Sequence, residues 1–364
     1  MKVALLGLHH PHSVILWRTL DALPEVTRIA LWNDNPAADD AMLPDGPSRA
    51  KTSPPTCDLS TVLADPALSF VVLCVRHDIV ADIAQQVVAA GKHLLVEKPA
   101  GLTSHEIRAL QDGADCARVT ASVLYVRRHH PCVVAARKLV QAGTLGVPLS
   151  VESRFLTTQV QFRDPSSWLF QRARSGGGVL LWLGCHCLDL MQYVAGDDIT
   201  AVGAMMATRS GEPIDVEDIA ALTLRFRSGA VGTFHAGYTL AFSGAGYVNL
   251  TGYDAYFGYN ARQGRLIWPD LESRLIVEKL RPSGESPRQE ERFDQPSSNL
   301  YGGQAGVQFF RQFIAAIAGE VPPPAPLSAA LRTALIVEAA ETASREGRVV
   351  AVAAEPITPQ PSSD

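Results

Sequence analysis

Two side chains in this sequence are suited to proton transfer, a lysine and a histidine. Lys98 stands between Glu97 and Pro99, directly after the apolar run 93–96. A lysine at the end of a strand can hydrogen-bond a substrate oxygen, and burial lowers its pKa so that it shares in proton transfer. His186 follows a run of three glycines, and an imidazole there can take a hydroxyl proton as a general base. The pair predicts acid–base chemistry on a hydroxyl group.

The glycine run leads into a helix that we expect from about residue 178 to 194. Trp182, His186 and Asp189 are spaced by four and three residues, so they share one face of that helix. A histidine satisfied within the core is the competing interpretation of His186. Most lysines are solvated surface groups, so position alone makes the case for Lys98.

A possible phosphate site begins at Gly7, where the first apolar run ends. The following residues occupy the place of a Gly-x-Gly-x-x-Gly fingerprint, but only its first glycine is present. The helix expected from Ser13 can still bind phosphate through its free N–H groups, and Ser13 and three histidines add donors. Histidines that only cap and pack a turn are an equal alternative. These histidines are His9, His10 and His12.

Apolar strands alternate with helical patterns as far as residue 124, which predicts a parallel sheet with helices on both faces. Ligands of such sheets bind outside the carboxyl ends of the strands. Polar and glycine residues at those ends therefore line one crevice and are candidate cofactor contacts. They are Gly7, Asn33, Asp34, Val75, Arg76, Glu97 and Lys98.

Asp34 lies where an acidic side chain usually meets ribose hydroxyls. Its charge would repel a 2′-phosphate, and no Lys or Arg follows within the next five residues. The pattern favours NAD and leaves NADP open. A turn that starts the next helix is the alternative interpretation.

Beyond residue 150 the pattern changes to strands in succession, which indicates a mainly antiparallel sheet. Two helices follow, at about 303–319 and 328–346, and a tail after residue 355 is expected to be disordered. The expected strands cover 150–157, 200–208, 219–227, 230–239, 246–252 and 265–268.

The whole chain limits the function classes. Its 364 residues suit two domains. A net charge of -5 offers no basic excess for nucleic acid, and no apolar run is long enough for a membrane span. Six scattered cysteines indicate a reducing, cytoplasmic compartment. Cys185 and Cys187 flank His186 without zinc-site spacing, so no metal is predicted.

The chain resembles the Gfo/Idh/MocA family of glucose-fructose oxidoreductase and inositol dehydrogenase. The resemblance covers nearly the whole sequence and rests on three segments in particular. They are Ala90–Pro99 with its Glu-Lys-Pro, Tyr125-x-x-Arg128-x-x-Pro131, and the glycine run with Gly184-x-His186-x-x-Asp189.

The resemblance implies an α/β fold. A doubly wound Rossmann domain over 1–124 would precede an α/β domain over 125–348 with a large, open, mostly antiparallel sheet, and 349–364 would form a terminal strand and tail. The final helix is expected to pack back on the first domain. The family transfers a hydride between NAD(P) and a sugar or cyclitol, usually as a homodimer or homotetramer.

By position in the family motifs, Lys98 would orient the reacting hydroxyl and His186 would act as general acid and base. Arg128 and Trp168 would lie near the substrate, together with Trp182 and Asp189 of the helix. Trp182 stands where the family usually has aspartate, and the glycine loop is altered. Two alternatives therefore stay open: a non-catalytic nucleotide- or sugar-binding regulatory protein, and an NAD-dependent glycosidase-type enzyme.

Overall fold

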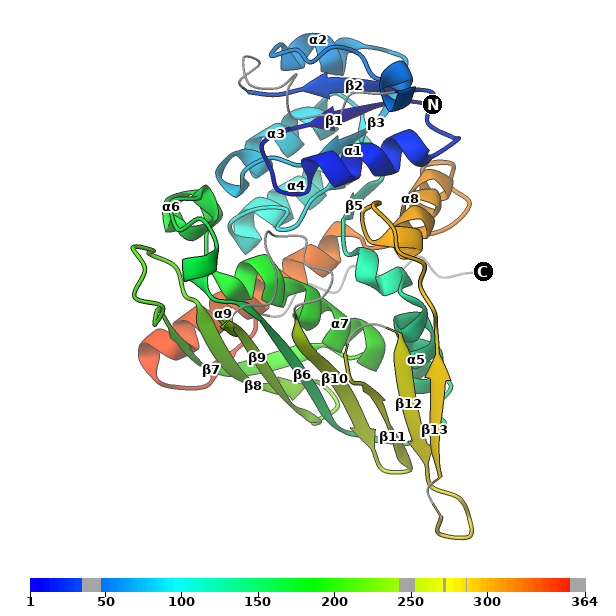
Figure 1. Ribbon diagram of the computed structural model, residues 1–364, viewed down its shortest axis with the longest axis vertical. Helices are drawn as coiled ribbons and strands as arrows, with labels where there is room; N and C mark the ends of the chain where they lie inside the picture. Colours follow the sequence, from blue (N-terminus) through cyan, green and yellow to red (C-terminus); the bar gives the residue numbers. More distant parts are fainter. Residues whose placement is uncertain (35–46, 242–252, 271–272, 286, 354–364) are drawn as a thin grey trace.

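The described part of the protein forms two sheets, stacked along its long axis (Figure 1). A computed structural model describes residues 1–34, 47–241, 253–270, 273–285 and 287–353. The smaller sheet belongs to the N-terminal part and the larger one begins at residue 148. The architecture confirms the expected α/β class with a Rossmann-like sheet and a second, mostly antiparallel sheet.

The five strands of the smaller sheet are parallel and run in the order β2-β1-β3-β4-β5. The chain passes from one side of β1 to the other between β2 and β3, which creates the switch point where ligands of such sheets bind. The strands are β1 (Lys2–Leu6), β2 (Arg28–Trp32), β3 (Leu68–Leu73), β4 (His93–Val96) and β5 (Ala121–Val123).

Helices connect these strands as the alternating pattern predicts. The fourth begins with the expected capping box, in which Thr103 accepts from the N–H of Glu106 and the Glu106 carboxylate accepts from the N–H of Thr103. The helices are α1 (Ser13–Ala22), α2 (Leu59–Ala64), α3 (His77–Ala89) and α4 (Ser104–Ala117).

The larger sheet has the order β13-β12-β11-β10-β6-β9-β8-β7-β14, and its strands pair antiparallel except for β6 with β9. The strands are β6 (Pro148–Thr158), β7 (Ile199–Ala207), β8 (Ile219–Phe226), β9 (Val231–Leu240), β10 (Asp254–Ala261), β11 (Gly264–Trp268), β12 (Arg274–Lys279), β13 (Arg288–Arg292) and β14 (Val350–Ala351).

Five of the expected strands correspond to β6, β7, β8, β9 and β11. The expected strand 246–252 and the tail after residue 355 lie outside the described residues. The sequence did not predict β10, β12 or β13. Every residue of β13 is exposed. Its sequence therefore has no alternation of apolar and polar residues from which a strand could be predicted.

One face of the larger sheet is covered by α5 (Pro131–Gln141), α7 (Cys185–Ala195) and α9 (Leu327–Glu346), which lie between the two sheets (Figure 1). The first half of α9 joins the core of the N-terminal domain, as does α8 (Gly303–Ile317), whose residue Phe313 meets Phe70 edge to face. The last helices thus return to the first domain, and the boundaries at 124 and 348 stay a prediction.

Among the described residues, one helical stretch, Arg172–Ala195, is long and apolar enough to cross a membrane by length and composition. It includes the short α6 (Arg172–Ser175) and α7, and 78% of its apolar window is buried inside the protein. Burial against the large sheet accounts for its apolar composition, because a helix enclosed by protein is apolar on all sides.

A buried ion pair joins α7 to the 3-10 turn η3 (Val126–His129). Arg128 donates from Nε and Nη2 to the two carboxylate oxygens of Asp189, at 2.9 and 2.6 Å, and from Nη1 to the carbonyl of Pro324. Both side chains are buried. The bidentate geometry compensates both charges and fixes α7 against the segment that follows the parallel sheet.

Replacing Arg128 with methionine is expected to lower the free energy of unfolding by about 3–5 kcal/mol, because Asp189 would remain buried without a partner. Urea denaturation measures the change. The double variant Arg128→Met with Asp189→Leu removes both charges and should recover most of the loss. A single-variant loss below about 1 kcal/mol, the value of an exposed pair, would contradict this role.

Candidate functional site

Lys98 is almost completely buried beyond the end of β4, with 1% of its surface exposed. Its Nζ donates a hydrogen bond to the carbonyl of Trp182 at 2.8 Å and lies 3.3 Å from the centroid of the Trp182 ring. The nearest carboxylate oxygen, Glu97 Oε1, is 3.9 Å away. Burial lowers the pKa of Lys98 from its ordinary value. An aromatic face and a carbonyl thus replace hydration around this ammonium group.

Glu97 is the only carboxylate that the structure pairs with Lys98 among the described residues, and two other side chains fix it. The hydroxyl of Tyr301 donates to Oε2 at 2.8 Å, and His12 Nδ1 lies 3.2 Å from Oε1. Burial raises the pKa of Tyr301 well above its ordinary value, so its hydroxyl stays a donor. Glu97 therefore connects Lys98 with the partly exposed His12.

The indole of Trp182 lies at the centre of a group of rings that we call the Trp182 cluster. His12 stacks on this indole, with ring centroids 5.5 Å apart and planes at 25°. Two further imidazoles and one indole surround it, at 5.4 to 6.5 Å. The Trp182 cluster consists of His10, His12, His77, Trp168 and Trp182.

Burial keeps three imidazoles of this region neutral at physiological pH. It lowers the pKa of His77 to about 3 and the pKa values of His10 and His186 well below their ordinary value. The positive charge of Lys98 adds to this effect at all three residues. A neutral imidazole has one donor and one acceptor nitrogen, so each ring can both donate and accept a hydrogen bond.

His186 enters the site from the second residue of α7. Its ring meets Tyr125 edge to face at 5.8 Å, and its Nδ1 is buried without a hydrogen-bond partner among the described residues. Just before α7, residues Leu180–Gly184 form a π-helix. The expected α-helix from residue 178 thus begins with a wider turn, which rotates Trp182 relative to His186 and is a frequent feature of functional sites.

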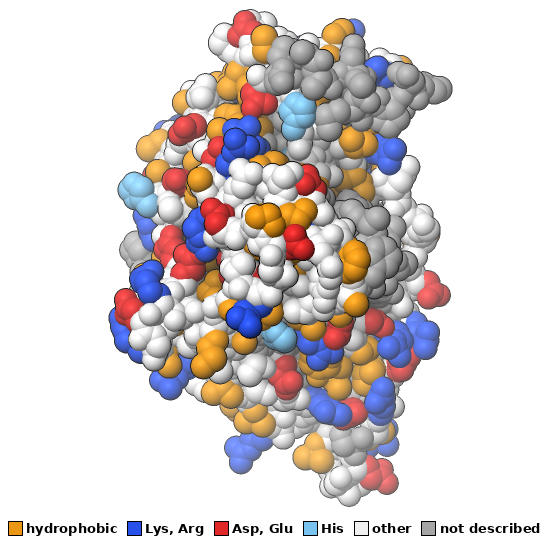
Figure 2. Space-filling model, turned by 60° about the vertical axis from the view of Figure 1, so that its left-hand side comes forward, with side chains coloured by type: hydrophobic (Ala, Val, Ile, Leu, Met, Phe, Trp, Pro, Cys, Tyr) orange, Lys and Arg blue, Asp and Glu red, His pale blue; other side chains and the backbone are white. Residues whose placement is uncertain are grey.

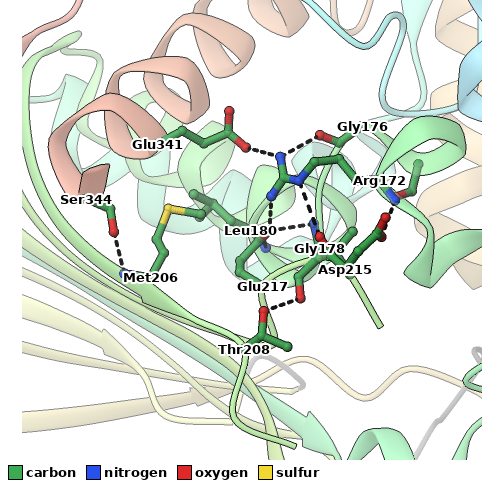
Figure 3. Close-up of polar contacts among 12 residues, drawn as sticks. Arg172, Gly176, Gly178, Leu180, Met206, Thr208, Asp215, Glu217, Glu341 and Ser344 are labelled. Atoms are coloured by element: carbon green, nitrogen blue, oxygen red, sulfur yellow. Dashed lines mark hydrogen bonds and ion pairs between the residues drawn. The ribbon is translucent and has the colours of Figure 1, made fainter. Parts of the chain in front are cut away.

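A buried carboxylate fixes the glycine run that opens this helix (Figure 3). Glu217 accepts from the N–H groups of Gly178 and Leu180 at 2.8 and 3.0 Å, and its backbone carbonyl accepts from Val179. A Cβ at Gly178 would stand 1.8 Å from that carbonyl, so only glycine allows the contact. Arg172 joins Glu217 to Glu341 of α9, which anchors the start of the site helix to two further elements.

The other end of the crevice has the features of a dinucleotide site. A Cβ at Gly7 would stand 2.2 Å from the carbonyl of Cys74, so glycine is required where β1 and β3 end. Asn33 is buried and accepts from the N–H of Leu8, while Asp34 stays partly exposed beside Arg76 at 3.7 Å. The N-terminus of α1 has neither a capping side chain nor an acidic residue in its first turn. Its N–H groups therefore fit an anionic phosphate.

The structure gathers most of the expected catalytic and binding side chains around this crevice. Arg128 and Asp189 form an ion pair with each other, and His9 is exposed on the loop after β1. Ser13 is buried with its hydroxyl near the sulfur of Cys74. The side chains that lie together are His12, Glu97, Lys98, Trp168, Trp182 and His186.

Sequence reasoning did not select His77 or Tyr301. His77 is the first residue of α3, directly after Arg76, so its position at a strand end was the available signal. Tyr301 comes from the segment before α8, more than 200 residues after Glu97 in the chain. No local pattern marks such a contact, which arises only because α8 returns to the first domain.

Comparisons with known proteins agree with this fold. Residues 2–125 match the family model described as an oxidoreductase family with an NAD-binding Rossmann fold, and residues 133–255 match the GFO/IDH/MocA C-terminal domain. The solved structure of levoglucosan dehydrogenase in complex with NADH and L-sorbose superposes with a TM-score of 0.85 at 21% identity, covering 98% of this chain and 99% of that one.

Curated relatives show more limited similarity. Levoglucosan dehydrogenase of Pseudarthrobacter phenanthrenivorans is 29% identical over 204 residues, 50% of this chain and 52% of the relative. The NAD-dependent scyllo-inositol 2-dehydrogenase of Bacillus subtilis is 26% identical over 181 residues, 49% and 51% of the two chains. The matched segment thus spans about half the length of these relatives.

The buried imidazoles predict a loss of stability in mild acid. The unfolded chain protonates His77 near pH 6.5, whereas the folded protein does so only near pH 3. The contribution of neutral His77 to the free energy of unfolding is therefore complete above pH 6.5, and it is lost as the pH falls towards 3. At pH 5, His77 alone should account for about 2 kcal/mol of lost unfolding free energy.

Urea denaturation at pH 7 and pH 5 measures this loss, and the His77→Asn variant should show a smaller difference between the two pH values. An equal difference in the variant and the wild type would show that His77 does not titrate as the structure indicates.

Proposed function

Because this chain belongs to the Gfo/Idh/MocA oxidoreductase family, we propose that it transfers a hydride between NAD and a hydroxyl-bearing carbon of a sugar or cyclitol. The observation that carries the proposal is the buried Lys98, whose ammonium group lies at the carboxyl edge of the parallel sheet and whose charge helps to keep His186 neutral. A lysine and an unprotonated imidazole in one crevice are the two groups that oxidation of a hydroxyl requires.

The residues at the strand ends fit the cofactor. Gly7 and the N-terminus of α1 would hold the phosphates, and Asp34 would meet the ribose hydroxyls. NAD supplies the acceptor for the two electrons and the hydrogen that leave the substrate carbon as hydride. NADP fits this arrangement less well because Asp34 would repel its additional phosphate.

The side chains of this protein would handle the proton and the oxygen. Lys98 donates to the substrate oxygen in place of the Trp182 carbonyl and stabilises the negative charge that develops there. His186 is neutral and accepts the hydroxyl proton as the carbonyl group forms. Glu97, fixed by Tyr301 and His12, keeps Lys98 charged and oriented.

Trp182 favours a second candidate function, a binding protein on the same fold. Its indole is 2% exposed, and its ring face covers the Lys98 ammonium where the family usually has a carboxylate. If this ring excludes the substrate from Lys98, the protein would bind nucleotide without redox turnover. A glycosidase-type reaction is distinguished by its products, because it releases a cleaved sugar and no net NADH.

The proposed assembly is a homo-oligomer formed by the open face of the larger sheet. This face has a hollow of about 920 Å³ lined by residues that include Arg154, Met205, His235 and Tyr256. Lys, Arg, Asp and Glu side chains are mixed on the face of the molecule that Figure 2 shows, without a large region of one sign. The six free cysteines, of which Cys57 and Cys116 are exposed, support a reducing, cytoplasmic location.

The direct test is NADH formation from NAD with levoglucosan, D-xylose, scyllo-inositol and myo-inositol, which relatives are named for. At least one sugar or cyclitol should be oxidised. Lys98→Met should lower kcat/KM by about 10²- to 10⁴-fold, because it removes the group that binds the reacting oxygen.

Lys138→Met on the exposed side of α5 is the matched control and should retain full activity. NAD binding without turnover of any sugar or cyclitol would overturn the proposal and favour the binding protein. Equal activity of Lys98→Met and wild type would also exclude the assigned role of Lys98.

A further inference from the structure

Two buried nitrogen atoms of the Trp182 cluster have no assigned role. The Nε2 atoms of His10 and His77 are inaccessible and have no hydrogen-bond partner among the described residues. Both side chains are about 3% exposed. Leaving a buried polar atom unpaired costs free energy, so two such atoms in one cluster indicate a position for a polar ligand group.

The contacts of His10 determine which of its nitrogens carries the proton. Its Nδ1 accepts a hydrogen bond from the backbone N–H of His12 at 3.1 Å. The ring is neutral because burial holds its pKa well below the ordinary value. The single ring proton is therefore on Nε2, and His10 presents an unpaired donor.

His77 has the opposite tautomer. Its Nδ1 lies 2.8 Å from the backbone carbonyl of Ser175, which can only accept, so Nδ1 carries the proton. Burial lowers the pKa of His77 to about 3, and the ring is neutral. Its Nε2 is consequently an unpaired acceptor. The two rings, whose centroids are 6.2 Å apart, offer one donor and one acceptor.

Aromatic faces enclose these two imidazoles. Trp168 lies 4.8 Å from the His77 ring and 5.8 Å from the His10 ring, and Trp182 lies about equally close to both at 5.5 and 5.4 Å. The partly exposed indole of Trp168 provides apolar surface for the C–H groups of a sugar ring, while the nitrogens provide hydrogen bonds. A hydroxyl group both donates and accepts, so it matches this pair of atoms.

We propose that His10 and His77 form a subsite for one hydroxyl group of a neutral sugar or cyclitol, with His10 Nε2–H donating and His77 Nε2 accepting. This subsite rests on the proposed function and specifies its substrate. A carboxylate or phosphate does not fit, because the lone pair of His77 would face a second acceptor. The hydroxyl recognised here differs from the reacting one, which Lys98 and His186 contact.

Asparagine variants distinguish the contribution of Nε2 from that of Nδ1 in each ring. In His10→Asn the amide oxygen can replace Nδ1 as acceptor, and in His77→Asn the amide N–H can replace Nδ1 as donor to Ser175. Neither side chain reaches the position of Nε2. Each variant should raise the KM for the oxidised sugar about 3- to 10-fold with little change in kcat, while NAD affinity stays unchanged. His105→Asn, exposed on α4, is the control.

Deoxy sugars identify the recognised hydroxyl. When that hydroxyl is absent from the substrate, the KM of wild type should rise to the level of the variants, and the variants should lose nothing further. If every single-deoxy analogue raises the KM of the variants by the same factor as it raises the KM of wild type, the subsite is overturned. A loss of NAD affinity in both variants, with an unchanged KM for sugar, would also overturn it and assign the atoms to the carboxamide of the cofactor.

Histidine ring nitrogen resonances provide a readout that needs no turnover. Levoglucosan or scyllo-inositol, added to the protein saturated with NAD, should shift the Nε2 signals of His10 and His77. If none of the sugars is oxidised, the proposed function fails, yet such shifts would still support the subsite. The absence of any shift with every sugar tested would overturn it, whether or not one of them is oxidised.

Discussion

The buried ammonium group of Lys98 is the constraint on which the rest of the site depends. A charge removed from water needs compensation close by, and here a carbonyl at 2.8 Å, a ring face at 3.3 Å and a carboxylate at 3.9 Å supply it. Additional positive charge next to it would be costly. The pKa values of His10, His77 and His186 are lowered first by burial, and the charge of this lysine contributes at all three residues.

Trp182 stands in place of the aspartate that the family usually has, but Lys98 and His186 are both present. An indole stabilises a cation through its ring face but cannot accept a proton, as an aspartate in the same place can. In the proposed reaction, proton transfer then depends on His186, and orientation of Lys98 depends on Glu97. The same indole lies beside the unpaired Nε2 atoms of His10 and His77, so Trp182 bears on both the proposed reaction and the proposed subsite.

The parallel sheet, the capping box at Thr103 and the crevice with Lys98 were predictable because local patterns encode them. Continuous apolar runs announce buried strands, and the carboxyl ends of parallel strands meet at one edge. The π-helical turn before α7 and the approach of Tyr301 to Glu97 depend on packing between distant segments. The charged, exposed strand β13 has no apolar face, so periodicity could not reveal it.

Binding of a nicotinamide dinucleotide by the altered Gly7 loop and the strand ends is the step on which the proposed function depends. Calorimetric titration of the cofactor-free protein with NAD and, separately, with NADP tests it most directly. We expect NAD to bind more tightly, because Asp34 stands partly exposed at the end of β2 where the 2′-phosphate of NADP would lie. Binding of neither dinucleotide, or a preference for NADP, would contradict it.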